Sequence, residues 1–212
     1  MSQTLETGEN TEMSKSRIVT ISIAVINILM WIINIIAGGG SAWGLFISGG
    51  GYVKEYGEAA FGYIFGQGQW WRLLTCGYLH MGIIHLACNM YALYIIGTKM
   101  EEALGSVKTA IFYNLGIIIT SFIWCLIFRN GSTVGASLGI FTLMGLYFSL
   151  CIRNKKEGKS SLSVAGRRYL ICYAIIGCFL GMGTIVVHLI GFCVGALLGV
   201  LIRFPKAEVC KL

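Results

Sequence analysis

Long stretches without a charged residue divide this chain and decide what it can fold into. The first, Ile18–Ala37, is long enough for a helix to cross about 30 Å of hydrocarbon. Further uncharged stretches cover Leu73–Thr98, Thr109–Phe128, Ser137–Ile152 and Tyr169–Ile202. Of the 212 residues, 56% are hydrophobic and only 12% are charged, whereas a soluble domain carries about 25% charged residues. The sequence therefore predicts an integral membrane protein.

The stretches predict an all-α polytopic fold with six transmembrane helices. The span within Leu73–Thr98 should begin near Ile83. The last stretch is too long for one crossing, so we expect Gly181–Thr184 to break it into two helices. The six helices would form one domain over residues 17–204, between a polar, disordered tail at residues 1–16 and a short tail at residues 205–212.

The connection from Gly38 to Trp71 is long and rich in Trp, Tyr and Phe. Such aromatic residues prefer the membrane–water interface, and a connection of this length favours a structured element. We therefore expect a membrane-interfacial first loop, which is either a structured element or an ordinary interfacial loop.

The positive charges predict an orientation. All but three of the 16 Lys and Arg residues fall on the side that would hold both termini, the exceptions being Lys54, Arg72 and Arg129. By the positive-inside rule both termini are expected in the cytoplasm. The orientation in the membrane then explains the excess of positive over negative charge, and no nucleic-acid partner is expected.

Four polar residues from three predicted helices should share one level just below the outer surface. His85 and Asn89 are four residues apart and therefore lie on one face of the second helix. Ser137 opens the fourth helix, and His188 lies about one turn into the sixth. Ionisable groups at such a depth are costly and are candidates for function.

These residue types suit acyl transfer. A serine hydroxyl is a weak nucleophile until a base such as His188 takes its proton. Free N–H groups at the start of the fourth helix, with His85 and Asn89, can donate to an oxyanion. The chain has no Asp, and its Glu residues are expected in tails or connections, so a catalytic site here would be a Ser-His dyad. Taken singly, Ser137 is better explained as a packing serine that bonds to a helix carbonyl, and a lone membrane histidine can equally be structural or functional.

A metal site has less support. The sequence holds no HExxH motif, and His80 and His85 are five residues apart, which predicts different faces of one helix. The eight Cys residues form no CxxC pair and mostly fall in apolar stretches, as is typical of small buried hydrophobes. We expect no metal and no cofactor.

Several spaced motifs follow one another from about Trp70 to Gly199. They are Trp71-Arg72, then HMGIIHLACN from His80 to Asn89, then Gly97, Glu101 and Gly105, then Gly135-Ala136-Ser137 with Ile140 and Phe141, and finally His188–Gly191 with Gly195. With these motifs the chain resembles the rhomboid family of intramembrane serine proteases.

The resemblance implies a six-helix fold with a water-filled cavity that opens to the outer face. Ser137 would match the family nucleophile, His188 its general base, and His85 and Asn89 its oxyanion-stabilising positions. Supporting positions would be Trp71, Arg72, His80, Glu101, Gly135, Gly191 and Gly195, of which the last two would let the sixth helix approach the fourth. Substrates would be other membrane proteins, cleaved in or near a transmembrane helix that can unwind within the lipid bilayer.

Two positions depart from the family pattern. Leu138 stands where a glycine usually follows the serine, and it would either crowd the contact between the fourth and sixth helices or point to lipid. Val187 stands where alanine is common. Two other functions stay open at this point: a rhomboid-like pseudoprotease that binds membrane clients without cleaving them, and a small transporter or channel subunit whose polar cluster lines a path.

Overall fold

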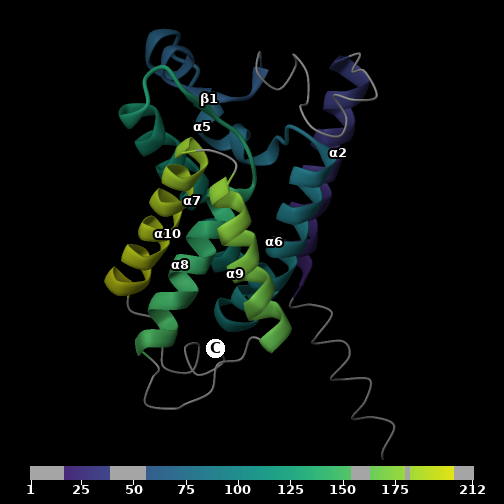
Figure 1. Ribbon diagram of the computed structural model, residues 1–212, viewed down its shortest axis with the longest axis vertical. Coiled ribbons are helices and arrows are strands. Elements are labelled where there is room, and N and C mark those ends of the chain that lie inside the picture. The colour runs from purple at the N-terminus through teal and green to yellow at the C-terminus, as the bar shows by residue number, and fades with distance from the viewer. Residues whose placement is uncertain (1–16, 39–55, 154–162, 180–181, 203–212) are drawn as a thin grey trace, which may run out of the picture.

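The computed structural model describes residues 17–38, 56–153, 163–179 and 182–202. The tails predicted at residues 1–16 and 205–212 lie outside the described residues. Within the described ranges, six helices have 16 or more residues and pack into a bundle (Figure 1): α2 (Ile18–Gly38), α6 (Ile83–Leu104), α7 (Ser106–Ile127), α8 (Ser137–Arg153), α9 (Val164–Phe179) and α10 (Met182–Leu201).

Helix boundaries agree with the prediction where a glycine or a polar segment precedes the apolar stretch. The second and fourth predicted helices begin at Ile83 and Ser137, as expected. α9 begins at Val164 rather than Tyr169, so Arg167 and Arg168 are helical. The prediction began this helix only after its charges, but long basic side chains at a helix end can extend toward water while the backbone stays helical.

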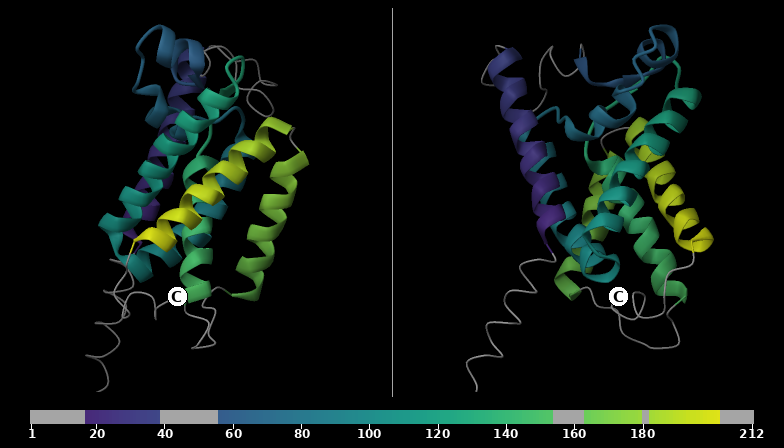
Figure 2. Two further views of the ribbon diagram at one scale, coloured as in Figure 1. Left: turned by 90° about the vertical axis from the view of Figure 1, so that its left-hand side faces the viewer. Right: turned by 180° about the vertical axis from the view of Figure 1, so that it is seen from behind.

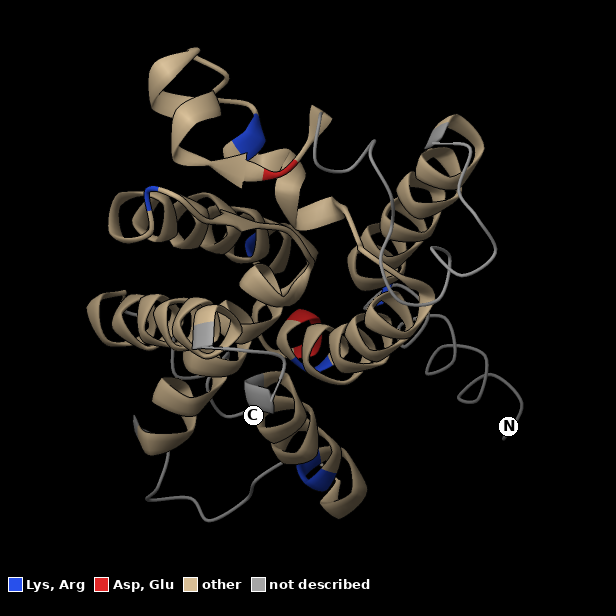
Figure 3. Cartoon of the chain, turned by 45° about the horizontal axis from the view of Figure 1, so that its top comes forward, with Lys and Arg blue, Asp and Glu red and all other residues tan. Residues whose placement is uncertain are grey.

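Three helices are long and apolar enough to cross a membrane, namely Ile18–Ala37, Ser106–Ile127 and Gly183–Leu201. The helical segments Arg72–Tyr78 and Ile83–Leu104 follow one another with a bend of 95° between them. If the two are counted as one broken span, they give a fourth crossing. The length and composition of these helices are those of an α-helical membrane protein. Six crossings remain a prediction. Figure 3 shows how sparsely the described helices carry charge.

The described part of the first loop is structured. It holds β1 (Ala59–Ala60), the π-helix η1 (Gly62–Gly66), α5 (Arg72–Thr75) and the 3-10 helix η2 (Cys76–Tyr78). β1 pairs antiparallel with β2 (Ser132–Thr133), with Ala59 opposite Thr133. Residues 39–55 of this loop lie outside the described residues.

Arg72 ties the loop together. Its Nη1 donates to the Glu58 carbonyl at 3.2 Å, and its guanidinium lies 4.0 Å above the centre of the Tyr63 ring. This hydrogen bond anchors Glu58, which directly precedes β1. β1 in turn pairs with β2, shortly before the start of α8. The upper end of the bundle in Figure 1, where β1 and α5 are labelled, is the end at which α8 and α10 begin.

α8 lies inside the bundle, between α7, α10 and α6 (Figure 2). Five of its apolar side chains have no exposed surface: Leu138, Ile140, Leu143, Leu146 and Leu150. A helix that is apolar on most of its faces is expected to be buried. Of the two alternatives for Leu138, a side chain that points to lipid is therefore excluded, because the side chain is fully enclosed.

α8 and α10 run side by side in the same direction at close range. A Cβ on Gly191 would lie 3.1 Å from the Leu138 carbonyl oxygen, and one on Gly195 would lie 1.9 Å from that of Thr142. Only residues without a side chain allow backbones to approach so closely. Ser137 and His188 stand shortly before the contact of Leu138 with Gly191, so both lie at the beginning of this interface.

Glu101 holds the opposite end of the bundle together. It is 2% exposed and accepts hydrogen bonds from Val19 N (2.9 Å), Thr20 N (2.9 Å), Thr20 Oγ1 (2.7 Å) and Ser106 Oγ (2.6 Å). Its carboxylate thus satisfies free N–H groups at the start of α2 and contacts the start of α7.

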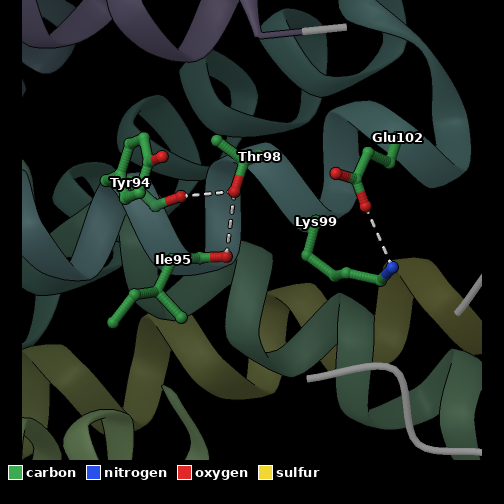
Figure 4. Close-up of polar contacts among 5 residues, drawn as sticks. All are labelled: Tyr94, Ile95, Thr98, Lys99 and Glu102. Atoms are coloured by element: carbon green, nitrogen blue, oxygen red, sulfur yellow. Dashed lines mark hydrogen bonds and ion pairs between the residues drawn. The ribbon is translucent and has the colours of Figure 1, made fainter. Parts of the chain in front are cut away.

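The expected place of this glutamate in a connection is wrong, since Glu101 lies inside α6. It is about 24 Å along the helix from His85 at 1.5 Å per residue, too far to serve as the acid of a triad. Figure 4 shows the neighbouring turn, where Lys99 pairs with Glu102 at 3.0 Å.

Candidate active site

Ser137 is the first residue of α8 and is 4% exposed. The first helical hydrogen bond at this end runs from Ile140 N to the Ala136 carbonyl at 3.0 Å. The N–H groups of the preceding residues have no partner within the helix, as at any helix start. The hydroxyl therefore lies beside backbone donors at the positive end of the helix dipole.

Gly135 brings Ser137 and His85 to one place. Its φ is +128°, and its N–H donates to the Cys76 carbonyl at 2.9 Å. A Cβ at this position would lie 3.1 Å from His85 Nε2 and 3.6 Å from Ser137 Oγ. The imidazole and the hydroxyl thus flank the same small volume, which is open because residue 135 has no side chain.

Asn89 lies one helical turn after His85 and is fully buried. Its Oδ1 accepts a hydrogen bond from the Tyr173 hydroxyl at 2.5 Å, whereas its Nδ2 has no partner among the described residues. A buried donor without a partner is costly and is a sign of a site that a ligand completes.

His80 lies beside this group but not on α6. Leu79 is extended, with φ −110° and ψ 144°, and the helix starts only at Ile83. The prediction that His80 and His85 lie on different faces of one helix is therefore wrong. Their ring centroids are 5.0 Å apart, and neither nitrogen of the buried His80 has a partner in the described part of the chain.

His188 is oriented by packing. Its ring stacks on Phe141 with centroids 4.1 Å apart and an interplanar angle of 12°. On another side, a Cβ on Gly177 would lie 2.8 Å from His188 Cε1 and 3.0 Å from Nδ1. Nδ1 is buried without a hydrogen-bond partner among the described residues, so packing against α8 and α9 orients the ring where a triad would use a carboxylate.

The remaining predicted positions lie in the first loop, at the far end of α6 and in the interface of α8 with α10. Trp71 is 58% exposed at the start of α5, Arg72 lies within the first loop, and Glu101 lies at the far end of α6. Gly191 and Gly195 lie in the interface of α8 with α10. The described residues hold no group of three His, Cys, Asp or Glu side chains that would suit a metal ion.

Sequence reasoning gave no role to three residues of the site. Phe141 follows Ser137 by four residues and so shares its helix face, which is a signal that could have been used. Tyr173 and Gly177 are also four residues apart, on α9. Nothing in the sequence tells which face of α9 turns toward α6 and α10, so their place emerges only from the structure.

The fold and the site together define a helical membrane protein with a buried polar cluster at one end of its bundle. A family model described as the Rhomboid domain matches residues 67–204. This chain is therefore an integral membrane protein that belongs to the rhomboid family.

Named relatives agree with this assignment. The chain is 34% identical to RHOMBOID-like protein 7 of Arabidopsis thaliana over 162 residues, which cover 74% of this chain and 50% of that protein. It is 41% identical to Rhomboid protease GluP of Bacillus subtilis over 90 residues, or 42% of this chain and 18% of that protein. It is 30% identical to Putative rhomboid protease YdcA of the same species over 144 residues, or 64% of this chain and 68% of that protein. The chain thus spans half or less of the length of the first two relatives.

Proposed function

We propose that this chain is an intramembrane serine endopeptidase with Ser137 as nucleophile and His188 as general base. The main observation in support is that polar side chains from different helices meet at the start of α8. Ser137 Oγ and His85 Nε2 both lie within 3.6 Å of one point beside Gly135. The parallel interface of α8 with α10 keeps His188 at the same level. Two relatives whose names describe them as rhomboid proteases, GluP and YdcA, support the same reaction class.

In the proposed reaction, Ser137 Oγ attacks the carbonyl carbon of the scissile peptide bond while His188 takes the hydroxyl proton. His188 Nδ1 and Cε1 face Gly177, which leaves Nε2 as the nitrogen for this transfer. Collapse of the tetrahedral intermediate breaks the C–N bond, and the protonated imidazole gives its proton to the leaving amine. Water then hydrolyses the acyl-enzyme with His188 again as base.

The negative charge on the intermediate needs donors that are already in place. We assign this role to His85, to the unpartnered Nδ2 of Asn89 and to backbone N–H groups at the start of α8. Asn89 is buried, His85 is half-buried on the same face of α6, and the N–H groups are held by the start of α8, so little reorganisation is needed when the charge develops. Losing one such donor is expected to slow the reaction by ~10²-fold.

We further propose six membrane crossings, with both termini in the cytoplasm and the site opening to the outer face. In support, the described Arg and Lys residues at the site end are few, Arg72 and Arg129, while Lys99, Lys108, Arg167 and Arg168 belong to the opposite end. Substrates would be other membrane proteins. Their transmembrane segment must unwind locally, because a peptide bond inside an intact helix is shielded by its own hydrogen bonds.

The proposal is tested with the full chain in liposomes that also carry a single-pass membrane protein, with the cleavage position mapped by mass spectrometry. Wild type should cut within or near the transmembrane segment, and Ser137→Ala should abolish the cut. Ser149→Ala is the matched control, because Ser149 is also a buried serine of α8 and its hydroxyl donates to the Ala196 carbonyl at 2.8 Å. Turnover retained by Ser137→Ala would overturn the assignment.

Labelling with a fluorophosphonate separates this enzyme from a protein that binds membrane clients without cleaving them. Wild type and Ser149→Ala should be labelled, and Ser137→Ala should not. Client binding without labelling or cleavage in the wild type would favour the non-cleaving alternative.

A further inference from the structure

Tyr173, on α9, connects that helix to the proposed oxyanion site. We propose that Tyr173 is a positioning residue whose hydroxyl fixes the carboxamide of Asn89 so that Nδ2 faces the reacting carbonyl. This inference rests on the proposed function and extends it to a residue that neither the motifs nor the charge pattern indicates.

The hydroxyl is well placed for this role. It donates to Asn89 Oδ1 at 2.5 Å across residues that are 84 positions apart in sequence. The Tyr173 ring stacks on Phe141 with centroids 5.5 Å apart and an interplanar angle of 26°. Because Phe141 also stacks on His188, the phenyl ring contacts both the tyrosine and the proposed base, and it limits the movement of each.

An asparagine needs such a partner to present one defined end. Rotation about its terminal torsion is broad and roughly two-fold, and it exchanges a carbonyl acceptor for an NH₂ donor. The Tyr173 hydroxyl, acting as donor, selects the carbonyl. The NH₂ group is then directed elsewhere, and it is buried without a partner among the described residues. Without the hydroxyl, the carboxamide is free to turn and present its oxygen to the oxyanion, which is repulsive.

Tyr169 supplies a matched comparison. It lies one turn earlier on α9, and its hydroxyl donates to the backbone carbonyl of Cys88 at 3.1 Å. Its ring packs edge-on against the ring of Tyr91, with centroids 4.4 Å apart. Tyr169 therefore also ties α9 to α6. Its ring stacks on that of Tyr173 with centroids 6.3 Å apart, a contact that Tyr169→Phe keeps, and its hydroxyl bonds to none of the proposed oxyanion donors. A general loosening of the two helices would appear in both Tyr→Phe variants, whereas loss of carboxamide orientation would appear only at Tyr173.

The test uses the full chain in liposomes and compares Tyr173→Phe, Tyr169→Phe and Asn89→Ala with wild type. We expect Tyr173→Phe to lower kcat by ~10-fold or more with KM little changed, since the affected contact forms only in the transition state. Tyr169→Phe should stay within about 2-fold of wild type. In the Asn89→Ala background, Tyr173→Phe should cause no further loss, because residues that act through one another are not additive.

A peptide aldehyde gives a second measurement, because its adduct with Ser137 carries the oxyanion. Its affinity should fall in Tyr173→Phe by about the same factor as kcat. Equal losses in the two Tyr→Phe variants, or full additivity with Asn89→Ala, would overturn the inference alone. Absence of Ser137-dependent cleavage in the wild type would overturn the proposed function and this inference with it.

Discussion

The imidazole of His188 lies flat against the phenyl ring of Phe141, with centroids 4.1 Å apart and the planes at 12°. In a Ser-His-Asp triad a carboxylate holds the histidine in its working orientation. Here Nδ1 has no partner in the part of the chain that the structure describes, and Gly177 of α9 packs against the same edge of the ring. In the proposed dyad, van der Waals packing therefore takes over the orienting role.

The first prediction concerns this stacking. Phe141→Leu removes the flat surface under His188 and should lower kcat by ~10-fold or more, since small misplacements of a catalytic group are costly. Phe141→Tyr keeps the ring and should retain most of the activity. The measurement is turnover of the liposome substrate, with Phe148→Leu as control.

Phe148 lies on the same helix and is 51% exposed. Its ring packs against that of Phe192 of α10, with centroids 5.6 Å apart. It therefore tests for a general effect of removing an aromatic contact between α8 and α10. Similar losses at positions 141 and 148 would argue against an orienting role for Phe141.

The second prediction concerns Gly135. Gly135→Ala places a methyl group 2.9 Å from His85 Cε1, on a backbone whose φ of +128° already disfavours a side chain. Such strain costs of order 1–3 kcal/mol, and relieving it must displace either His85 or Ser137. Cleavage should fall by ~10²-fold, and fluorophosphonate labelling should slow as well.

The control for this variant lies in the same connection. A Cβ on Gly131 would make ordinary contacts, at 3.4 Å from Phe128 Cβ and Trp124 Cζ2, so Gly131→Ala should stay near wild type. A Gly135→Ala protein with undiminished turnover would show that the space between His85 and Ser137 is not used in the reaction.

The sequence was sufficient to predict the helical membrane fold and the start of two helices. Uncharged stretches have few alternatives in a membrane, and a glycine or polar segment before Ile83 and Ser137 marks where a helix can begin. The 3.6-residue period also predicted that His85 and Asn89 share a face. These features depend on neighbouring residues alone, which is why sequence reasoning found them.

Features that depend on distant residues were missed or misplaced. Glu101 is buried because donors about 80 positions away, at the start of α2, meet it, and no local pattern announces them. Leu138 suits lipid and a packed interior equally well, because both are apolar. The spacing of His80 and His85 was interpreted with the period of a helix, whereas Leu79 is extended and α6 begins only after His80.

The third prediction separates two adjacent glutamates. Glu101→Gln replaces one of two carboxylate oxygens by a donor that faces other donors, and hydrogen bonds to a charged group contribute about 1.5–3 kcal/mol each. The variant should lose about 2 kcal/mol or more of stability toward unfolding in detergent. Glu102→Gln should lose far less, because the Lys99–Glu102 pair is partly exposed, with 39% of the Glu102 side chain accessible. Equal unfolding midpoints for Glu101→Gln and Glu102→Gln would contradict the structural role of Glu101.

The fourth prediction addresses the contact between α8 and α10. A Cβ on Gly195 would lie 1.9 Å from the Thr142 carbonyl oxygen and 2.9 Å from Leu146 N. Backbone cannot yield as a flexible side chain can, so Gly195→Ala must push α10 away from α8. Since His188 is carried by α10 and Ser137 by α8, this shift should lower kcat by ~10²-fold together with thermal stability.

Leu197→Ala serves as the control for that displacement, because Leu197 is on the same helix and is 57% exposed on its outer surface. It should leave both turnover and thermal stability near those of wild type. If Gly195→Ala lowered stability but left turnover intact, the separation of α8 and α10 would not govern the reaction, and a dyad formed across that interface would have to be abandoned.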